Sequence, residues 1–158
     1  MRTVLDIIDN KDPLADAWLE PFKQYASVSD DGRDALLLTL LRSAILRVQE
    51  YADRALFRCR VRQTCRPDAE TGQIRLYLGG GEDLSVTYDY DGSEVPYVRN
   101  TANLITVQAR GSVISVEYTT RTSDSWRDQA RPTVFRYATA LYDGEPLETL
   151  NSILNEVL

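Results

Sequence analysis

The leucine-dense segment from Asp31 to Asp53 constrains the fold more than any other feature of this chain. Its apolar residues recur at the i, i+4 and i+7 spacing of a buried helix face, and they are Leu37, Leu41, Ala44, Ile45, Val48 and Ala52. Leu36, Leu40 and Leu46 lie outside this stripe and widen the apolar surface. Since each buried leucine stabilises a fold by about 2 kcal/mol, we expect a long helix that is central to its domain or covered by a second subunit.

From Leu56 onward the apolar period changes from that of a helix to that of a strand. Phe57, Cys59, Val61 and Cys65 fall on one face of an extended chain, while Arg58, Arg60 and Arg62 fall on the other. Asp91-Gly92 is a strong signal for a hairpin turn. Further alternating runs predict strands near residues 74–78, 84–90, 95–98, 105–109 and 114–118. We therefore expect five or six short strands in a mostly antiparallel sheet or a small barrel.

The two ends of the chain are expected to be mainly helical. Residues 1–11 fit a short strand or a helical turn, and Asp12-Pro13 is typical of a helix start. Near the other end, a polar loop is predicted over 119–130. A helix is predicted to follow, beginning at Arg131-Pro132 and ending at Tyr142. Pro146 then opens a last helix with one apolar face, formed by Leu147, Leu150, Ile153, Leu154, Val157 and Leu158.

These elements predict an α+β fold in a single domain over residues 1–158. Residues 1–56 are expected to be helical and to include the long leucine-rich helix. Residues 57–120 form the central β-rich part, and residues 131–158 hold two C-terminal helices. No linker long enough to divide the chain is visible in the sequence.

The residue types argue against catalysis. The chain has no histidine, which removes Ser-His-Asp and Cys-His nucleophile systems and every His-ligated metal site. Cys59 and Cys65 on one strand would lie ~20 Å apart, too far for a disulfide. Asp30, Asp31 and Asp34 are a candidate carboxylate group, but the start of a helix accounts for them. We expect no enzyme activity, no cofactor and no metal; a carboxylate-dependent enzyme is the rival interpretation, and a deep pocket with close acidic side chains would support it.

Two glycine-containing turns offer weaker ligand motifs. The run 79–81 lacks the lysine and Ser/Thr that follow a phosphate-binding loop. The segment 89–92 lacks the third ligand and the distal glutamate of a calcium loop. Both are predicted to be plain turns.

Net charge bears on the partners. A formal charge of −6 and a sequence pI near 4.7 argue against a general nucleic-acid binder, although an acidic wall would let DNA pass without sticking. Arg58, Arg60 and Arg62 are candidates for contact with phosphate or with an acidic partner; the alternative is a solvated strand face paired with Asp and Glu on a neighbouring strand. No apolar run approaches the ~20 residues that cross a bilayer, and Asp6 and Asp9 interrupt any signal-peptide core, so we expect no membrane association and a cytoplasmic location in the host.

Two segments resemble the head–tail connector (adaptor) family of tailed bacteriophages and prophages. The first is SDDGRDALLLTLLRSA (29–44) leading to VQEYADRAL (48–56), which is similar to the family's acidic turn, leucine-rich helix and V-E-x-Y-T-G-R-A-L ending. The second is ISVEYT (114–119) followed after a loop by RPTVFRYATALY (131–142). Together they cover about half the chain. The β-rich middle is larger than the hairpin of small family members.

The resemblance implies a structural protein of the virion, located at the head–tail junction and assembled in the bacterial cytoplasm. Such proteins form a ring, expected to be a dodecamer, beneath the portal; the ring extends the DNA channel, lets DNA pass without specific binding, and offers the tail or a stopper protein a docking surface. Leu36, Leu40 and Leu46 would then contact the next copy. The C-terminal helix would reach the portal through Leu150, Ile153, Leu154 and Val157. The alternative is a small cytoplasmic binding or regulatory module without catalysis.

Overall fold

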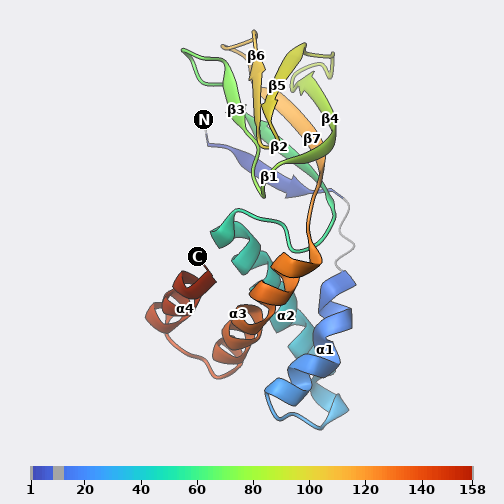
Figure 1. The fold of residues 1–158 in the computed structure, drawn as a ribbon, viewed down its shortest axis with the longest axis vertical. Helices are drawn as coiled ribbons and strands as arrows, with labels where there is room; N and C mark the ends of the chain where they lie inside the picture. The colour runs from blue at the N-terminus through green and yellow to red at the C-terminus, as the bar shows by residue number, and fades with distance from the viewer. Residues whose placement is uncertain (1, 9–12, 158) are drawn as a thin grey trace. The chain divides into compact units, whose positions relative to one another are not determined.

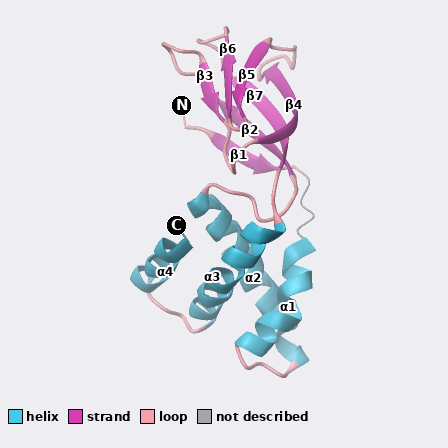
Figure 2. Cartoon of the chain, viewed as in Figure 1, coloured by secondary structure: helices cyan, strands magenta, loops and turns pink. Residues whose placement is uncertain are grey.

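The computed structural model describes residues 2–8 and 13–157, with side chains from residue 14 to residue 156 in the second range. The chain divides into two compact units. Of the described residues, 2–8 and 58–121 form the first unit, and 13–57 and 122–157 form the second. Strands make up the first unit and helices the second (Figures 1 and 2). The predicted α+β class is therefore confirmed. A single domain over the whole chain stays a prediction.

The helical unit is a bundle in which α2 packs against α1 and α3, and α4 packs against α3. The predicted stripe of the long helix is confirmed for its first five residues, because Leu37, Leu41, Ala44, Ile45 and Val48 are fully buried, whereas Ala52 at its end is half-buried. Phe135 of α3 closes the core between α1 and α2, with its ring centroid 5.5 Å from that of Phe22 and 5.9 Å from that of Trp18. The elements are α1 (Pro13–Tyr25), η1 (Asp31–Arg33), α2 (Asp34–Ala52), α3 (Asp124–Tyr142), α4 (Leu147–Leu154) and η2 (Asn155–Val157).

Helix α3 begins earlier than the sequence predicts. The Ser123 hydroxyl accepts a hydrogen bond from the backbone N–H of Trp126 at 3.2 Å and caps the helix there, so the predicted polar loop to residue 130 is wrong. Pro132 lies inside α3 rather than at its start. It is on the exposed side, where water can satisfy the carbonyl that loses its backbone partner. Among the helices of residues 13–157, none combines the length and the apolar character needed to cross a membrane.

The β-rich unit contains two antiparallel sheets, with strand orders β1-β2-β7-β4 and β3-β6-β5. Residues 4–7, which the sequence leaves ambiguous, form the edge strand β1 and pair with β2. The described part of the unit holds more strands than the five or six predicted, and the two sheets do not close into a barrel. The strands are β1 (Val4–Ile7), β2 (Arg60–Cys65), β3 (Gln73–Arg75), β4 (Gly81–Tyr88), β5 (Tyr97–Thr101), β6 (Leu104–Val107) and β7 (Ile114–Thr120).

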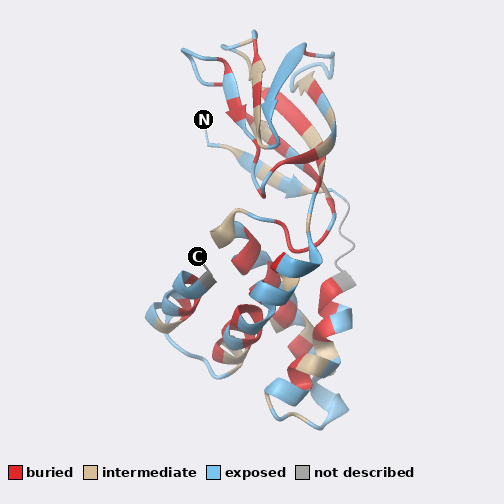
Figure 3. Cartoon of the chain, viewed as in Figure 1, coloured by how far each residue is buried: buried red, intermediate tan, exposed pale blue. Residues whose placement is uncertain are grey.

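The core of the β-rich unit lies between the two sheets. Buried stretches run through the strands of this unit (Figure 3). As the alternation predicts, Cys59, Val61 and Cys65 are buried, and so is Phe57, which belongs to the helical unit. Because the inward side chains of β2 are buried, its arginines are left on the outward face of the four-stranded sheet.

Candidate interaction surfaces

The first candidate surface is the arginine ladder, which we define as Arg58, Arg60, Arg62 and Arg121. Arg60 and Arg62 lie in β2, and Arg58 lies two residues before that strand. Arg121 directly follows β7, which pairs with β2. Their side chains are partly open to solvent, from 27% for Arg60 to 65% for Arg58. The strand period thus gathers four guanidinium groups on one outward sheet face.

Two glutamates from neighbouring strands neutralise part of the ladder. Glu117 of β7 lies 2.7 Å from the Arg62 guanidinium and 3.8 Å from that of Arg60. Glu82 of β4 lies 2.9 Å from Arg58 and 3.8 Å from Arg121. The predicted pairing with acidic residues on neighbouring strands is present, and four arginines facing two glutamates leave an excess of positive charge. A contact with phosphate or with an acidic partner stays a prediction.

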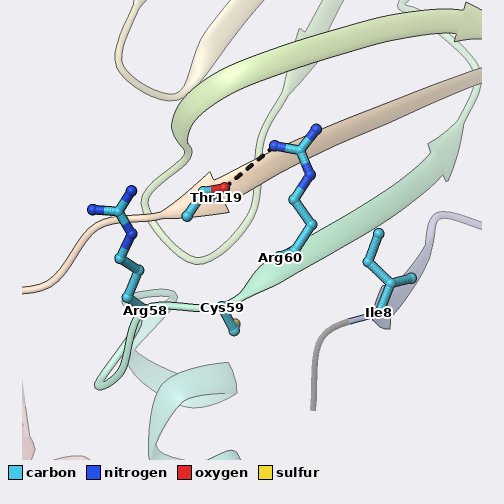
Figure 4. A pocket seen from close by; sticks show the side chains of 5 residues that line it. All are labelled: Ile8, Arg58, Cys59, Arg60 and Thr119. Carbon is cyan, nitrogen blue, oxygen red and sulfur yellow. Dashed lines mark hydrogen bonds between the residues drawn. The ribbon is translucent and has the colours of Figure 1, made fainter. Parts of the chain in front are cut away.

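A hollow of about 510 Å³ lies at the lower end of the ladder, lined by Ile8, Arg58, Cys59, Arg60 and Thr119 (Figure 4). We call it the arginine hollow. The Arg60 guanidinium donates to the Asp83 carbonyl at 2.7 Å and to the Thr119 hydroxyl at 3.3 Å, which holds it over the rim. Ile8, 42% exposed, supplies an apolar wall.

The lining of the arginine hollow includes no carboxylate and therefore no general base paired with a nucleophile. It can offer guanidinium hydrogen bonds to an acidic group that also carries an apolar or aromatic body. This chemistry is that of a binding surface.

The second candidate surface is the outer face of α2. Leu36 is 51% exposed and Leu46 is 38% exposed, while Leu40 between them is half-buried. Ser43 is exposed on the same helix face, so the leucines form an interrupted apolar stripe. Among residues 2–8 and 13–157, no contact covers this stripe fully. A role as the contact with the next copy stays a prediction.

The third candidate surface is α4, where the structure buries most of the predicted docking residues. Leu150, Ile153 and Leu154 face into the helical unit and are buried, and the side chain of Val157 lies outside the described residues. The sequence places Leu147 on the same apolar face, but its side chain is 67% exposed. It is the first residue of α4, and the buried residues of this helix begin at Leu150. These three side chains can meet a portal only if α4 leaves its place against α3.

The acidic group at the start of η1 and α2 is built around a lysine. The buried Lys23 ammonium lies 2.6 Å from Asp31, 2.9 Å from Asp34 and 3.9 Å from Glu20. The three carboxylates lie close enough together to suggest a metal site, but Lys23 already occupies the space between them. The hydrogen bond to Asp31 is the main reason why the pKa of Lys23 is raised, and the same bond lowers the pKa of Asp31.

Asp30 has a separate role at this helix start. It accepts a hydrogen bond from the backbone N–H of Gly32 at 2.8 Å and so caps η1. The predicted helix-start role therefore accounts for Asp30, and the ion cluster with Lys23 accounts for Asp31 and Asp34.

Several residues of these surfaces were not identified from the sequence. Ile8, Thr119 and Arg121 reach the ladder or its hollow only through the pairing of β1 and β7 with β2, across more than fifty residues of chain. The alternation of β2 identified its own arginines but carries no information on which strands lie beside it. Lys23 gave a sequence signal only as a basic residue in the last turn of α1.

No family model and no curated protein matches this sequence. Solved structures do match its fold. A chain in the neck of a native gene transfer agent particle, computed with C12 symmetry, superposes with a TM-score of 0.64 over 98% of this chain and 94% of that chain, at 16% identity. A chain in the neck of an empty gene transfer agent particle, computed with C6 symmetry, superposes with a TM-score of 0.64 over 89% of this chain and 84% of that chain, at 18% identity. A chain in the virion of a native gene transfer agent particle superposes with a TM-score of 0.64 over 89% of this chain and 84% of that chain, at 17% identity.

The chain has the fold of a neck protein. The likeness covers both the helical and the β-rich unit, since nearly the whole chain is matched. The resemblance to the connector family that the sequence carries in two segments is thereby confirmed at the level of the fold, and the enlarged β-rich segment is part of the shared architecture.

Proposed function

We propose that this protein is a structural subunit of the neck of a tailed phage, prophage or related particle, where copies form a ring between portal and tail and extend the DNA channel. The observation that carries the proposal is the match over 98% of the chain to a protein in a neck computed with C12 symmetry. A dodecameric ring is the corresponding assembly. In this function the chain binds other proteins and catalyses no reaction.

The exposed leucines of α2 support self-association. A closed ring requires a heterologous contact, in which one patch on a subunit meets a different patch on the next. Leu36, Leu40 and Leu46 provide an apolar patch that the chain leaves partly open. We assign this patch to the contact with the neighbouring copy.

The charge distribution supports DNA passage without specific binding. Residues 58–121 contain eight basic and eight acidic side chains, so the net charge of −6 is carried by the rest of the chain, which is mainly the helical unit. An acidic helical unit facing a channel would repel the phosphate backbone and keep the duplex mobile. The ring would in this way guide DNA by charge rather than by sequence.

The portal and a tail or stopper protein are the partners that we propose. Leu150, Ile153, Leu154 and Val157 are the residues assigned to the portal, and the burial of the first three requires α4 to move outward when it docks. Leu147 is already exposed and would be the first side chain to make contact. Assembly in the host cytoplasm followed by residence at the head–tail junction fits this order of events.

Electron microscopy tests the proposal directly. The chain is co-expressed with the portal protein encoded nearest to its gene, and the purified portal is imaged with and without it. An added ring of density below the portal, labelled by a tag on this chain, is the expected result. Portals that remain bare at saturating chain, together with particles whose necks lack the tag, would contradict the proposal and favour a cytoplasmic binding module.

A further inference from the structure

The β-hairpin that follows β4 presents an acidic, aromatic tip. Asp89, Tyr90 and Asp91, which we call the acidic tip, are all exposed, and Tyr90 is 74% open to solvent. The Tyr90 ring leans on that of Tyr88, with 5.4 Å between centroids. Glu94 on the returning arm is also exposed and adds a third carboxylate. An exposed tyrosine ring is a typical element of a protein–protein contact, and the aspartates beside it favour a basic partner surface.

Backbone hydrogen bonds hold the acidic tip in one shape. Tyr88 N–H donates to the Ser93 carbonyl and Gly92 N–H to the Tyr88 carbonyl, each at 2.9 Å. The Asp91 carboxylate accepts from the Ser93 hydroxyl at 2.7 Å and from its N–H at 2.9 Å, which lowers the pKa of Asp91. The aspartate is therefore charged at neutral pH and already oriented. A pre-formed loop loses little conformational entropy when it binds.

The acidic tip and the arginine hollow lie at opposite ends of the same sheet. Arg60 pairs with Thr119 at one end of the β2–β7 ladder, and Cys65 pairs with Ile114 at the other. Ile114 in turn pairs with Tyr88, from which the hairpin extends (Figure 1). The tip of one chain cannot reach the hollow of the same chain. Two complementary patches at opposite ends of one unit are what head-to-tail association between copies requires.

We propose that the acidic tip of one copy docks in the arginine hollow of the next copy. The inference rests on the ring that we propose above and adds a second contact, between β-rich units, to the one on α2. The two aspartates meet the guanidinium groups of Arg58 and Arg60, and the Tyr90 ring lies on the apolar wall of Ile8. Four arginines face Glu82, Glu117 and, opposite Arg62 on β1, Asp6, so the ladder keeps an excess of positive charge that is complementary to the acidic tip.

The features of the hollow favour a protein side chain over a nucleic-acid phosphate. Glu82 and Glu117 lie within the ladder and lower its attraction for a polyanion. An aliphatic wall gives no contact to a phosphate but packs well against an aromatic ring. The occupant that supplies both carboxylates and a ring is a second copy of this chain.

Disulfide trapping between full-length chains tests the contact without requiring a ring. One variant carries Glu94→Cys and a second carries Thr119→Cys, both with Cys59→Ala and Cys65→Ala, so that Asp89, Asp91, Arg58 and Arg60 are kept and no native thiol can cross-link. After mild oxidation of the mixture, we expect the heterodimer to accumulate faster than either homodimer. The matched control pairs Glu70→Cys, on another exposed turn of the same unit, with Thr119→Cys. Heterodimer formation no faster than in this control would overturn the proposal.

Charge reversal gives an independent measurement on particles or portal complexes. Arg58→Glu/Arg60→Glu and Asp89→Arg/Asp91→Arg should each weaken association by roughly a hundredfold or more, and mixing the two variants should restore it. Arg2→Glu/Arg66→Glu, two exposed sites in the same unit, is the control for net charge.

The outcomes separate this contact from the ring itself. Rings that form normally with either reversal alone overturn the docking of the tip while leaving the neck function in place. Loss of duplex DNA binding in Arg58→Glu/Arg60→Glu with unchanged self-association also overturns it, in favour of a phosphate contact. Absence of the wild-type chain from the neck refutes the proposed function and is judged by imaging, not by trapping.

Discussion

The side chain of Gln63 serves as a backbone partner for Tyr77. Its amide oxygen accepts a hydrogen bond from the Tyr77 N–H at 3.0 Å, while its amide nitrogen donates to the Arg75 carbonyl at 2.7 Å. The Tyr118 hydroxyl lies 3.0 Å from both the Gln63 amide oxygen and the Tyr77 carbonyl oxygen and shares its one proton between these two acceptors. A buried glutamine of β2 thus connects the four-stranded sheet to the segment at the end of β3. A buried polar network with all members satisfied fixes one arrangement of the two sheets.

Replacing Gln63 by leucine should destabilise the protein by about 2–4 kcal/mol. The substitution leaves the part-buried Tyr77 N–H and Arg75 carbonyl without this partner, and a buried group of this kind costs about 1–3 kcal/mol. Urea unfolding followed by far-UV circular dichroism measures the loss. Gln73→Leu, at an exposed site on β3, is the matched control and should leave the midpoint unchanged. Equal midpoints for both variants would show that the network does not stabilise the sheets.

Two leucines of α2 should respond oppositely to the same substitution. Leu41→Asp places a carboxylate in the core of the helical unit and should cost about 4 kcal/mol or more, which unfolds that unit. Leu36→Asp, on the outer face, should keep the wild-type melting curve but reduce assembly on the portal. Thermal melts and sedimentation with portal measure the two effects. A wild-type melt for Leu41→Asp, or full assembly of Leu36→Asp, would contradict the respective assignment.

Acid stability should depend on the ion pair between Asp31 and Lys23. The pKa of Asp31 lies below its ordinary value of 3.8, because Lys23 donates a hydrogen bond to the charged carboxylate. A carboxyl group with a lowered pKa stabilises the folded state above pH 4 or so, and this stabilisation is lost as the pH falls through the folded-state value. Asp31→Asn should therefore flatten the decline in stability below that pH. Asp143→Asn, at another exposed site of the helical unit, serves as the control.

Helix α4 should tolerate change at its first residue and not at its later turns. Leu154→Ala removes a fully buried side chain and should cost about 2–5 kcal/mol, whereas Leu147→Ala should be nearly neutral to folding. Denaturant midpoints of the two variants measure this difference. If α4 moves outward to dock, Leu147→Ala should also slow the binding of the chain to portal. Equal stability of the two variants would show that α4 is not anchored against its own unit.

The sequence predicts those parts of the fold that depend on local periodicity. The stripe of α2 and the inward residues of β2 are correct because burial repeats at a period that sequence alone reveals. The start of α3 was missed because Arg131-Pro132 is typical of a helix start, while the Ser123 cap stands in a polar stretch. Gln63 is polar at an inward strand position, and only the folded position of Tyr77 and Arg75 explains it.

The candidate surfaces divide in the same way. The alternation of Arg58, Arg60 and Arg62 and the exposed leucines of α2 can be read from spacing. The glutamates that pair with the arginines, and Ile8 in the hollow, arrive there through strand pairings between distant segments. The burial of Leu150, Ile153 and Leu154 depends on the packing of α4 against α3, which no local pattern specifies.

Both ends of the segment 58–121 are held by one carboxylate, since Glu82 contacts Arg58 and Arg121. Helix α2 ends at Ala52 and its packing partner α3 begins at Asp124. The long segment between them, which we call the excursion, raises the entropic cost of packing α3 against α2. Once the excursion has folded and its ends are clamped together, the effective loop is much shorter, and each halving lowers the entropic cost of closure by roughly 0.6 kcal/mol.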